Sequence, residues 1–389
     1  MAPMLLLLAL CFTPQATAPS PFEILRTWTG KEYDHLGIGL SALGDVDGDG
    51  TPDFVLGAMQ GAYAFSFGPG HAQVISGKDG RVLYTVRGLA KAPGYSGDAF
   101  GDTVAALGDL DKDGVSDFAV GAWRHQEFNG CVRVYSGKTG AVLATLEGSS
   151  NFGSLIVSLG DLDGDHVPDF AASGDHSTVL SGASFLVLGE CSGHLWARAG
   201  DLLLRDMPSE LDWVTFPKFQ RRAGVASGRG SPRFLCGDVD LDGWPDLLRI
   251  QPSDDALLQP PGRSSELPVQ FLSGKDGAVL RSIWLPFPSR LAASRGGPLG
   301  DASGDGVPDV FAQAERHEGG ACVWVLDGKT GAILASTQSP SGTFGRKFVP
   351  LGDIDHDGRP EFLLSDFESK EGSRCGGAVH LVRIRVGAK

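Results

Sequence analysis

An acidic nonapeptide with the pattern Asp-x-Asp-x-Asp-Gly-x-x-Asp recurs six times along the chain, with small variations, and a short apolar run follows each copy. The copies begin at Asp45, Asp109, Asp161, Asp238, Asp301 and Asp353. A repeated unit of this size cannot bury an apolar face alone, so neighbouring units stack and share a core. We therefore expect one repeat domain, although 389 residues would allow two or three ordinary domains.

Each acidic copy lies in a unit that has the pattern of four short strands. In the second unit we expect strands at 103–107, 118–122, 131–136 and 141–146, where apolar or alternating runs are separated by turn residues. Ser-Gly-Lys-Thr-Gly joins the last two strands, and its glycines can take the positive φ of a tight hairpin. This pentapeptide pattern begins at Ser76, Ser136, Ser273 and Asp327. Four-stranded antiparallel units repeated around an axis form a β-propeller, so the sequence predicts an all-β propeller fold.

The spacing of the copies predicts the number of blades. Copies one and four, two and five, and three and six are separated by 192 or 193 residues, as in a duplicated half with three units. The residues before the first copy and after the last one add up to about one further repeat. We expect six blades, with seven as the alternative, and we expect the strand at 22–28 to complete the last blade. The expected repeats are 36–88, 100–147, 152–189, 233–284, 297–337 and 344–386, with an insertion at 191–232.

The amino-terminal residues have the layout of a secretory signal peptide, because an apolar run from Met4 to Phe12 precedes small and polar residues. No Lys or Arg comes before the run, and Pro19 follows the expected cleavage site. We expect residues 1–18 to be a signal peptide and 19–389 to be a secreted, periplasmic or cell-surface domain. The alternative is a buried or disordered amino-terminal segment. We expect no transmembrane segment, since nothing further along is apolar for the 18 or more residues of a membrane span.

Charge and cysteine content limit the partners and the covalent chemistry. The formal net charge of -14 repels nucleic acid, so we expect no nucleic-acid partner. Beyond the expected signal peptide the cysteines are odd in number, which leaves at least one free thiol. Cys191 and Cys236 flank the insertion and could form a disulfide across its ends; alternatively, the cysteines are small buried residues. No CxxC spacing supports a zinc site.

Short Phe-Gly and Gly-Ala steps flank several acidic loops. Phe-Gly begins at Phe100, Phe152 and Phe344, and Gly-Ala begins at Gly57 and Gly121. This pattern around a calcium-type loop resembles the FG-GAP repeat family, best known from the propeller head of integrin α chains and from many secreted bacterial proteins. The resemblance covers nearly the whole expected mature chain and implies a calcium-binding propeller. Integrin heads have seven such blades, and the proline of the family name is missing here, so the resemblance does not imply cell adhesion.

Alternate positions of each acidic loop carry the oxygen atoms that a hard cation prefers. Ca²⁺ takes about six to eight oxygen ligands. Positions 1, 3, 5 and 9 would supply side-chain oxygens and position 7 a backbone carbonyl, so we expect up to six Ca²⁺ ions. The expected ligands are Asp45, Asp47, Asp49, Thr51 and Asp53; Asp109, Asp111, Asp113, Val115 and Asp117; Asp161, Asp163, Asp165, Val167 and Asp169; Asp238, Asp240, Asp242, Trp244 and Asp246; Asp301, Ser303, Asp305, Val307 and Asp309; and Asp353, Asp355, Asp357, Arg359 and Glu361.

Three of the six loops depart from the full ligand set. The third has His166 where glycine normally turns the chain, the fifth has Ser303 in place of a carboxylate, and the sixth has the longer Glu361 at position 9. We expect these three to bind the cation more weakly. An EF-hand or a dockerin shares the first half of such a loop, but an EF-hand needs Glu at position 12, where no copy has an acid. Ordinary Asp-Gly turns would explain one copy, but not six aligned copies.

The function that these features favour is binding. The carboxylates lie in turns that join strands, so we expect a structural role for calcium. The chain has no GxSxG, no HExxH and no Gly-rich phosphate loop, so we expect no catalytic residues and no organic cofactor; a hydrolase or a lyase is the lesser alternative. We expect an exported, non-enzymatic module that binds or scaffolds a protein through the face opposite the calcium loops.

Three segments on that opposite face are candidates for partner contact. Residues 59–70 are rich in Gly and aromatic residues, and residues 252–267 are largely polar. The insertion carries several aromatic residues and a basic stretch from Lys218 to Arg233. This stretch could anchor an anionic partner; alternatively, its aromatic residues pack on the blades and its arginines are solvated.

A carbohydrate-binding, lectin-like propeller is the runner-up function, with a glycan as the ligand. Seven tryptophans would suit stacking on sugar rings. However, Trp123, Trp244, Trp284 and Trp324 do not recur at one blade position, which argues against a repeated sugar site.

Overall fold

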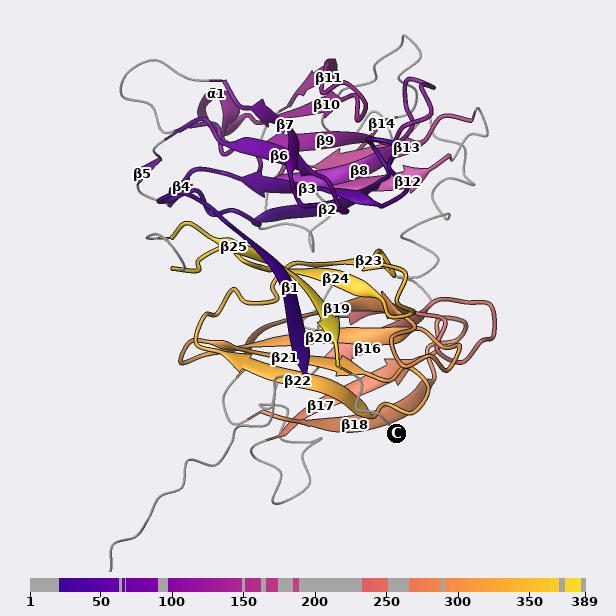
Figure 1. Ribbon diagram of the computed structural model, residues 1–389. Coiled ribbons are helices and arrows are strands. Elements are labelled where there is room, and N and C mark those ends of the chain that lie inside the picture. Colours follow the sequence, from indigo (N-terminus) through magenta and orange to yellow (C-terminus); the bar gives the residue numbers. More distant parts are fainter. Residues whose placement is uncertain are drawn as a thin grey trace, which may run out of the picture.

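The fold consists of antiparallel sheets, one for each acidic copy, as the sequence predicts (Figure 1). The computed structural model describes residues 21–62, 65–66, 68–89, 97–148, 151–161, 166–173, 185–188, 233–250, 266–287, 291–370 and 375–385. Within these residues the chain is all-β, apart from the four-residue helical turn α1 (His125–Phe128).

The sheets are numbered here in chain order of their first strands. Sheet 1 contains β2 (Gly39–Gly44), β3 (Asp53–Ala58), β6 (His71–Ile75) and β7 (Val82–Arg87); sheet 2 contains β8 (Thr103–Gly108), β9 (Asp117–Ala122), β10 (Cys131–Tyr135) and β11 (Val142–Glu147); sheet 3 contains β12 (Leu155–Gly160), β13 (Asp169–Ser173) and β14 (Phe185–Leu188). Sheet 4 contains β15 (Arg233–Gly237), β16 (Asp246–Ile250), β17 (Glu266–Leu272) and β18 (Val279–Pro286); sheet 5 contains β19 (Leu291–Gly300), β20 (Asp309–Arg316), β21 (Ala321–Leu326) and β22 (Ile333–Ser339); sheet 6 contains β23 (Phe348–Gly352), β24 (Glu361–Asp366), β25 (Ala378–Ile384) and β1 (Phe22–Thr29). The short strands β4 (Gly61–Ala62) and β5 (Phe65–Ser66) pair with each other between β3 and β6.

Burial differs systematically between the second and the fourth strand of a sheet. Every residue of β3, β9 and β24 is buried, whereas in β11 only Leu146 is. The middle strands are covered by neighbouring sheets on both faces, so their sequences are continuous apolar runs. The fourth strand forms the outer edge, and most of its residues are exposed or half-buried.

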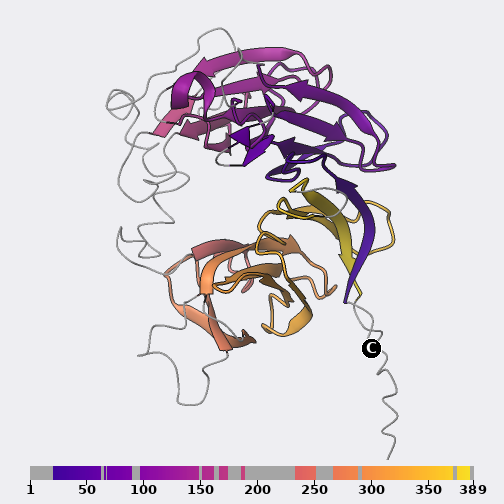
Figure 2. The same cartoon turned by 90° about the vertical axis from the view of Figure 1, so that its left-hand side faces the viewer.

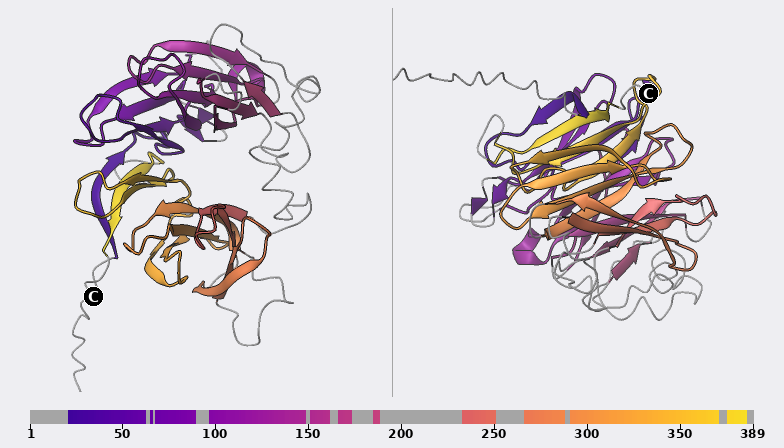
Figure 3. Two further views of the ribbon diagram at one scale, coloured as in Figure 1. Left: turned by 90° about the vertical axis from the view of Figure 1, so that its right-hand side faces the viewer. Right: turned by 90° about the horizontal axis from the view of Figure 1, so that it is seen from below.

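Apolar clusters join neighbouring sheets in the order 3-2-1-6-5-4. Between sheets 5 and 6, Phe311 stacks on Phe348 with ring centroids 4.2 Å apart; between sheets 6 and 1, Trp28 meets Phe54 edge-on at 5.2 Å. Figures 2 and 3 show the sheets side by side in this order. All residues between sheets 3 and 4, from 189 to 232, lie outside the described ones, so the closed six-bladed ring stays a prediction.

Glycines of the Phe-Gly and Gly-Ala steps allow adjacent sheets to touch backbone to backbone. A Cβ on Gly121 of sheet 2 would lie only 2.0 Å from the carbonyl oxygen of Gly153, which enters sheet 3. A Cβ on Gly57 would lie equally close to the carbonyl of Gly101, whose own φ is +94°. A larger residue at these places would push the sheets apart.

The amino-terminal strand β1 completes sheet 6, as the sequence predicts. It pairs antiparallel with β25, with Phe22 opposite Ile384 and Thr29 opposite Ala378. The Nε1 atom of Trp28 also donates to the carbonyl of Gly80 in sheet 1 at 3.0 Å. Strand β1 therefore joins the last sheet of the chain to the first.

Some expectations change or fall outside the described residues. Sheet 5 begins at Leu291 rather than near 297, because Leu291 pairs with Arg316 and extends the ladder. Cys236 is a buried free thiol, as the buried-cysteine alternative expects. The signal peptide and the insertion 191–232 lie outside the described residues. Within the described residues, no helix has the length and apolarity to cross a membrane.

Closure by β1 predicts a large difference between two neighbouring substitutions. Phe22 is 7% exposed and packs edge-on against Phe362, with ring centroids 6.2 Å apart, whereas Ile24 is 58% exposed. Phe22→Ala should lower the free energy of unfolding by about 3 kcal/mol, since it leaves a cavity in the core. Ile24→Ala is the control and should change it by less than about 0.5 kcal/mol. Equal effects in urea-unfolding curves would contradict a docked β1.

Candidate metal centres

The six acidic loops connect the first strand to the second strand of each sheet, and loops of neighbouring sheets lie close together. A Cβ on Gly108, just before loop 2, would lie 2.7 Å from Pro168 of loop 3; the same relation holds between Gly237 and Pro308 at loops 4 and 5. Loops 1 and 6 line a shared pocket of about 570 Å³. The loops therefore share one face of the sheet assembly.

In five of the loops, the aspartate at position 1 shapes the turn by accepting at least two backbone hydrogen bonds. In loop 1, Asp45 Oδ1 accepts from the amide of Asp49 at 3.0 Å, and Asp45 Oδ2 accepts from Gly50 at 2.8 Å. The same pair of bonds recurs at Asp109, Asp238, Asp301 and Asp353. These bonds close the turn that brings the other carboxylates together.

Left-handed backbone conformation is needed at two positions of these loops. Position 6 is glycine in five loops; in loop 3 His166 has φ 67° and still donates its amide to Asp161 at 3.0 Å. This is the strained conformation that the sequence predicts for His166. Position 4 was not predicted: Lys112, Leu241 and His356 have φ near 60° there without being glycine.

The aspartate at position 9 is fully buried and joins the loop to the outer hairpin turn of the same sheet. Asp53 Oδ2 accepts from the amide of Val46 at 2.8 Å, and Asp53 Oδ1 accepts from Gly77 of the Ser-Gly-Lys turn at 3.0 Å. The equivalent bonds recur at Asp117, Asp246 and Asp309. Burial raises the pKa of all four carboxyls, that of Asp117 to about 6, although the backbone hydrogen bonds oppose this shift.

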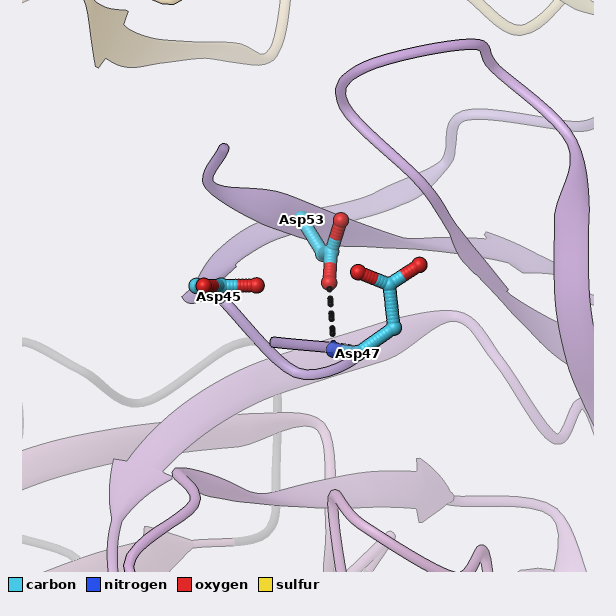
Figure 4. Close-up of side chains that lie close together, drawn as sticks. All are labelled: Asp45, Asp47 and Asp53. Atoms are coloured by element: carbon cyan, nitrogen blue, oxygen red, sulfur yellow. Dashed lines mark hydrogen bonds between the residues drawn. The ribbon is translucent and has the colours of Figure 1, made fainter. Parts of the chain in front are cut away.

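Among the residues that the structure describes, four loops bring three carboxylates close enough to share one cation. One oxygen from each member of the group lies within 4.8 Å of the others. Figure 4 shows the three side chains of loop 1. The groups are Asp45, Asp47 and Asp53; Asp109, Asp111 and Asp117; Asp238, Asp240 and Asp246; and Asp353, Asp355 and Asp357. An all-oxygen donor set of this kind fits a hard divalent cation.

The position-5 aspartates of loops 1, 2 and 4 lie outside these groups. The Oδ1 atoms of Asp49, Asp113 and Asp242 instead accept the backbone amide two residues further on, at 2.9 to 3.0 Å. Their role as ligands, and that of the position-7 carbonyls, stays a prediction.

The three departing loops differ from one another in the structure. Loop 6 forms a group of three carboxylates, but its third member is Asp357 and not Glu361 at position 9. The Oε1 atom of Glu361 is buried without a hydrogen-bond partner. Burial raises the pKa of Glu361 to about 7. In loop 5 the described residues form no group of three acids, and Ser303 Oγ donates to Asp301 at 3.3 Å. Most of loop 3, from 162 to 165, lies outside the described residues.

The lysines of the Ser-Gly-Lys turns lie beside the acidic loops, and sequence reasoning missed this contact. Lys138 Nζ donates to the backbone carbonyl of Asp113 at 3.1 Å and lies 3.9 Å from its carboxylate. In sheets 4 and 5, Lys275 and Lys329 lie 3.9 and 3.8 Å from the position-5 carboxylate. The signal was present in the sequence, because lysine follows glycine in all four copies of the turn.

Structural and metal-binding carboxylates should respond differently to substitution. Without metal, Asp117→Ala should cost about 3 kcal/mol of unfolding free energy, because the amides of Leu110 and Gly137 lose their acceptor inside the core. Asp111→Ala should cost less than about 0.5 kcal/mol without metal and should act only by weakening cation binding. Urea unfolding with a chelator present measures both. Similar losses in the two variants would contradict the anchoring role of position 9.

Comparisons with known proteins agree with the fold and the loops. The family model described as "FG-GAP repeat" matches residues 37–75, which span most of sheet 1 and its acidic loop. Integrin alpha-5 of Xenopus laevis is 33% identical over 228 residues, which cover 54% of this chain and 21% of the relative. Integrin alpha-4 of Xenopus laevis is 28% identical over 150 residues, which cover 33% of this chain and 13% of the relative.

The matched regions thus span about a fifth or less of these relatives. Among solved structures, a crystal structure of BBS1N in complex with ARL6DN, soaked with mercury, is 11% identical and covers 95% of this chain and 99% of that chain. Its TM-score of 0.36 is too low to support a conclusion. The chain thus contains one matched FG-GAP repeat and is similar to integrin α chains, and its all-β sheets with acidic loops agree with that similarity.

Proposed function

We propose that this chain is an exported, calcium-stabilised propeller module that binds a protein partner and is not an enzyme. The observation that carries the proposal is the close grouping of three carboxylates in each of loops 1, 2 and 4. These loops belong to a repeat that resembles those of integrin α chains. The amino-terminal apolar run supports export.

Calcium suits these loops better than magnesium. Mg²⁺ demands near-ideal octahedral geometry and keeps several waters, whereas Ca²⁺ accepts more oxygen ligands in irregular arrangements. The loops offer carboxylates at several depths, from the buried Asp53 to the exposed Asp45 and Asp47, together with backbone carbonyls. We assign calcium to these loops as a structural ion.

The cation would relieve repulsion that the fold itself creates. Loops 1, 2 and 4 each bring like charges within 4.8 Å of one another, and exposed lysines such as Lys138 supply only partial compensation. A bound cation would neutralise the loop and favour the folded chain by mass action. It would thereby stabilise the turns that join the first two strands of each sheet.

The chemistry of the described buried groups supports a non-enzymatic role. His125 Nδ1 lies 3.1 Å from Asp98 Oδ2, an arrangement that resembles part of a catalytic triad, but both side chains are buried. Burial raises the pKa of the nearby thiol of Cys131 to about 12, so it stays protonated and is a poor nucleophile.

The placement of the tryptophans favours a protein partner over a sugar. Trp28 and Trp324 pack against Phe54 and Phe287 between sheets, so these rings are not available for stacking on a ligand. Trp244, in loop 4, is 42% exposed. Of the segments that the sequence marks for partner contact, 191–232 and all but the last two residues of 252–267 lie outside the described residues, and their role remains part of this proposal.

Calcium should raise the melting temperature by about 10 °C at neutral pH, since three sites at about a hundredfold excess over Kd would add several kcal/mol. The gain should shrink at pH 5, because the raised pKa of Asp117, about 6, favours its protonated form and a proton competes with the cation. Without metal the pH dependence of stability has the opposite sign. A carboxyl whose pKa is raised on folding stabilises the folded chain less as pH rises from about 4 to 7. Calorimetry in chelator and in calcium, at both pH values, checks this. A melting temperature that does not respond to calcium would refute the assignment.

Partner binding should depend on the basic insertion rather than on the calcium loops. Arg221→Glu together with Arg222→Glu reverses charge within the basic stretch and should abolish capture of an anionic protein partner by the immobilised chain. The calcium-induced rise in melting temperature should stay unchanged in this variant. Binding on a glycan array without any protein partner would favour the lectin alternative instead.

A further inference from the structure

Sheet 6 lacks a component that sheets 1, 2, 4 and 5 share. In those sheets a Ser-Gly-Lys or Asp-Gly-Lys turn joins the last two strands, and its glycine amide donates to the position-9 aspartate. In sheet 6 the fourth strand is β1, from the other end of the chain, so no such turn links it to β25. Glu361 Oε1 is consequently left without a hydrogen bond.

Arg383 of β25 takes the place of the missing turn lysine. The strand register puts it opposite Glu361 on one side and opposite Glu23 of β1 on the other. Its Nη1 atom donates to Asp355 Oδ2 at 3.1 Å and also to Asp357 Oδ2, while Nε donates to Glu23 Oε2 at 3.3 Å. One guanidinium therefore links two carboxylates of loop 6 to the amino-terminal strand.

This guanidinium is held more firmly than the turn lysines. The Arg383 side chain is 16% exposed, against 53 to 59% for Lys138, Lys275 and Lys329, each of which reaches one carboxylate at 3.8 to 3.9 Å. Charge-assisted bonds from a partly buried arginine to several carboxylates are stronger than single exposed ion pairs. The lysines can swing away when a cation arrives, whereas Arg383 is fixed from three sides.

We propose that Arg383 is the resident counter-ion of loop 6 and excludes a divalent cation from this loop while β1 stays docked. A cation there would need the oxygens of Asp355 and Asp357 that Arg383 already binds. It would also place two positive charges beside a guanidinium that cannot lose its proton. The inference rests on the proposed calcium binding of the other loops, and it makes the closure of sheet 6 independent of metal.

Arg81 provides the matched comparison within the same chain. Its Nη2 atom lies 2.7 Å from Asp47 Oδ2 of loop 1, but its side chain is 51% exposed and it contacts one carboxylate of that loop. It can therefore leave when loop 1 takes a cation. Arg81→Gln should not change the number of ions bound.

Counting the calcium ions bound per chain tests the inference. Equilibrium dialysis with radioactive calcium, on the full chain, should give one more ion for Arg383→Gln than for the native chain, and the native number for Arg81→Gln. An unchanged number in Arg383→Gln would overturn the inference. A native chain that binds no calcium would contradict the proposed function instead, so the two failures are distinguishable.

A second pair of variants gives the answer even if Arg383→Gln does not fold. Asp111→Asn removes an expected ligand from loop 2 and should lose one calcium ion. Asp355→Asn alters an exposed residue of loop 6 and should lose none, because Arg383 already occupies that carboxylate. Loss of one ion in Asp355→Asn would show that loop 6 takes calcium and would overturn the inference.

Discussion

The buried carboxylate at position 9 is the interaction on which the architecture of each complete sheet depends. It receives amides from the acidic loop, which joins the first two strands, and from the outer turn, which joins the last two. A charge-bearing group with no access to water must be matched by donors, and these amides supply them. The inner and outer hairpins are therefore fixed relative to each other before any cation is considered. The expected metal binding uses the same carboxylate side chain that already accepts these structural hydrogen bonds.

Features with a local signal could be predicted from the sequence. The six copies of the acidic loop predicted the six sheets. The paired glycines of the Ser-Gly-Lys turns predicted the outer hairpins, where Gly80 and Gly140 do have positive φ. The closure by β1 followed from a unit that ended one strand short. Even the strain at His166 was predictable, because position 6 needs a residue that tolerates a left-handed conformation.

Contacts that depend on register between distant strands could not be predicted. Arg383 meets Glu23, Asp355 and Asp357 only because β25 pairs with both β24 and β1 in a particular register. No sequence period points to this contact, since the repeat has no arginine at that place in the other units. The positive φ of Leu241 was also missed, because nothing in a leucine signals a left-handed conformation. The sequence thus predicts the repeated parts of the site better than its exceptions.

The pairing of β1 with β25 has a consequence for how the molecule is made. Strand β1 cannot pair until the distant strand β25 has been synthesised, since Phe22 pairs with Ile384. Contacts of such large sequence separation form slowly, because a long loop must close before they gain any energy. Until that moment β25 presents an unpaired edge, the kind of surface on which immature chains aggregate. Protection of this edge therefore depends on a contact between strands that lie far apart in the sequence, and a partly synthesised chain that lacks β25 cannot make it.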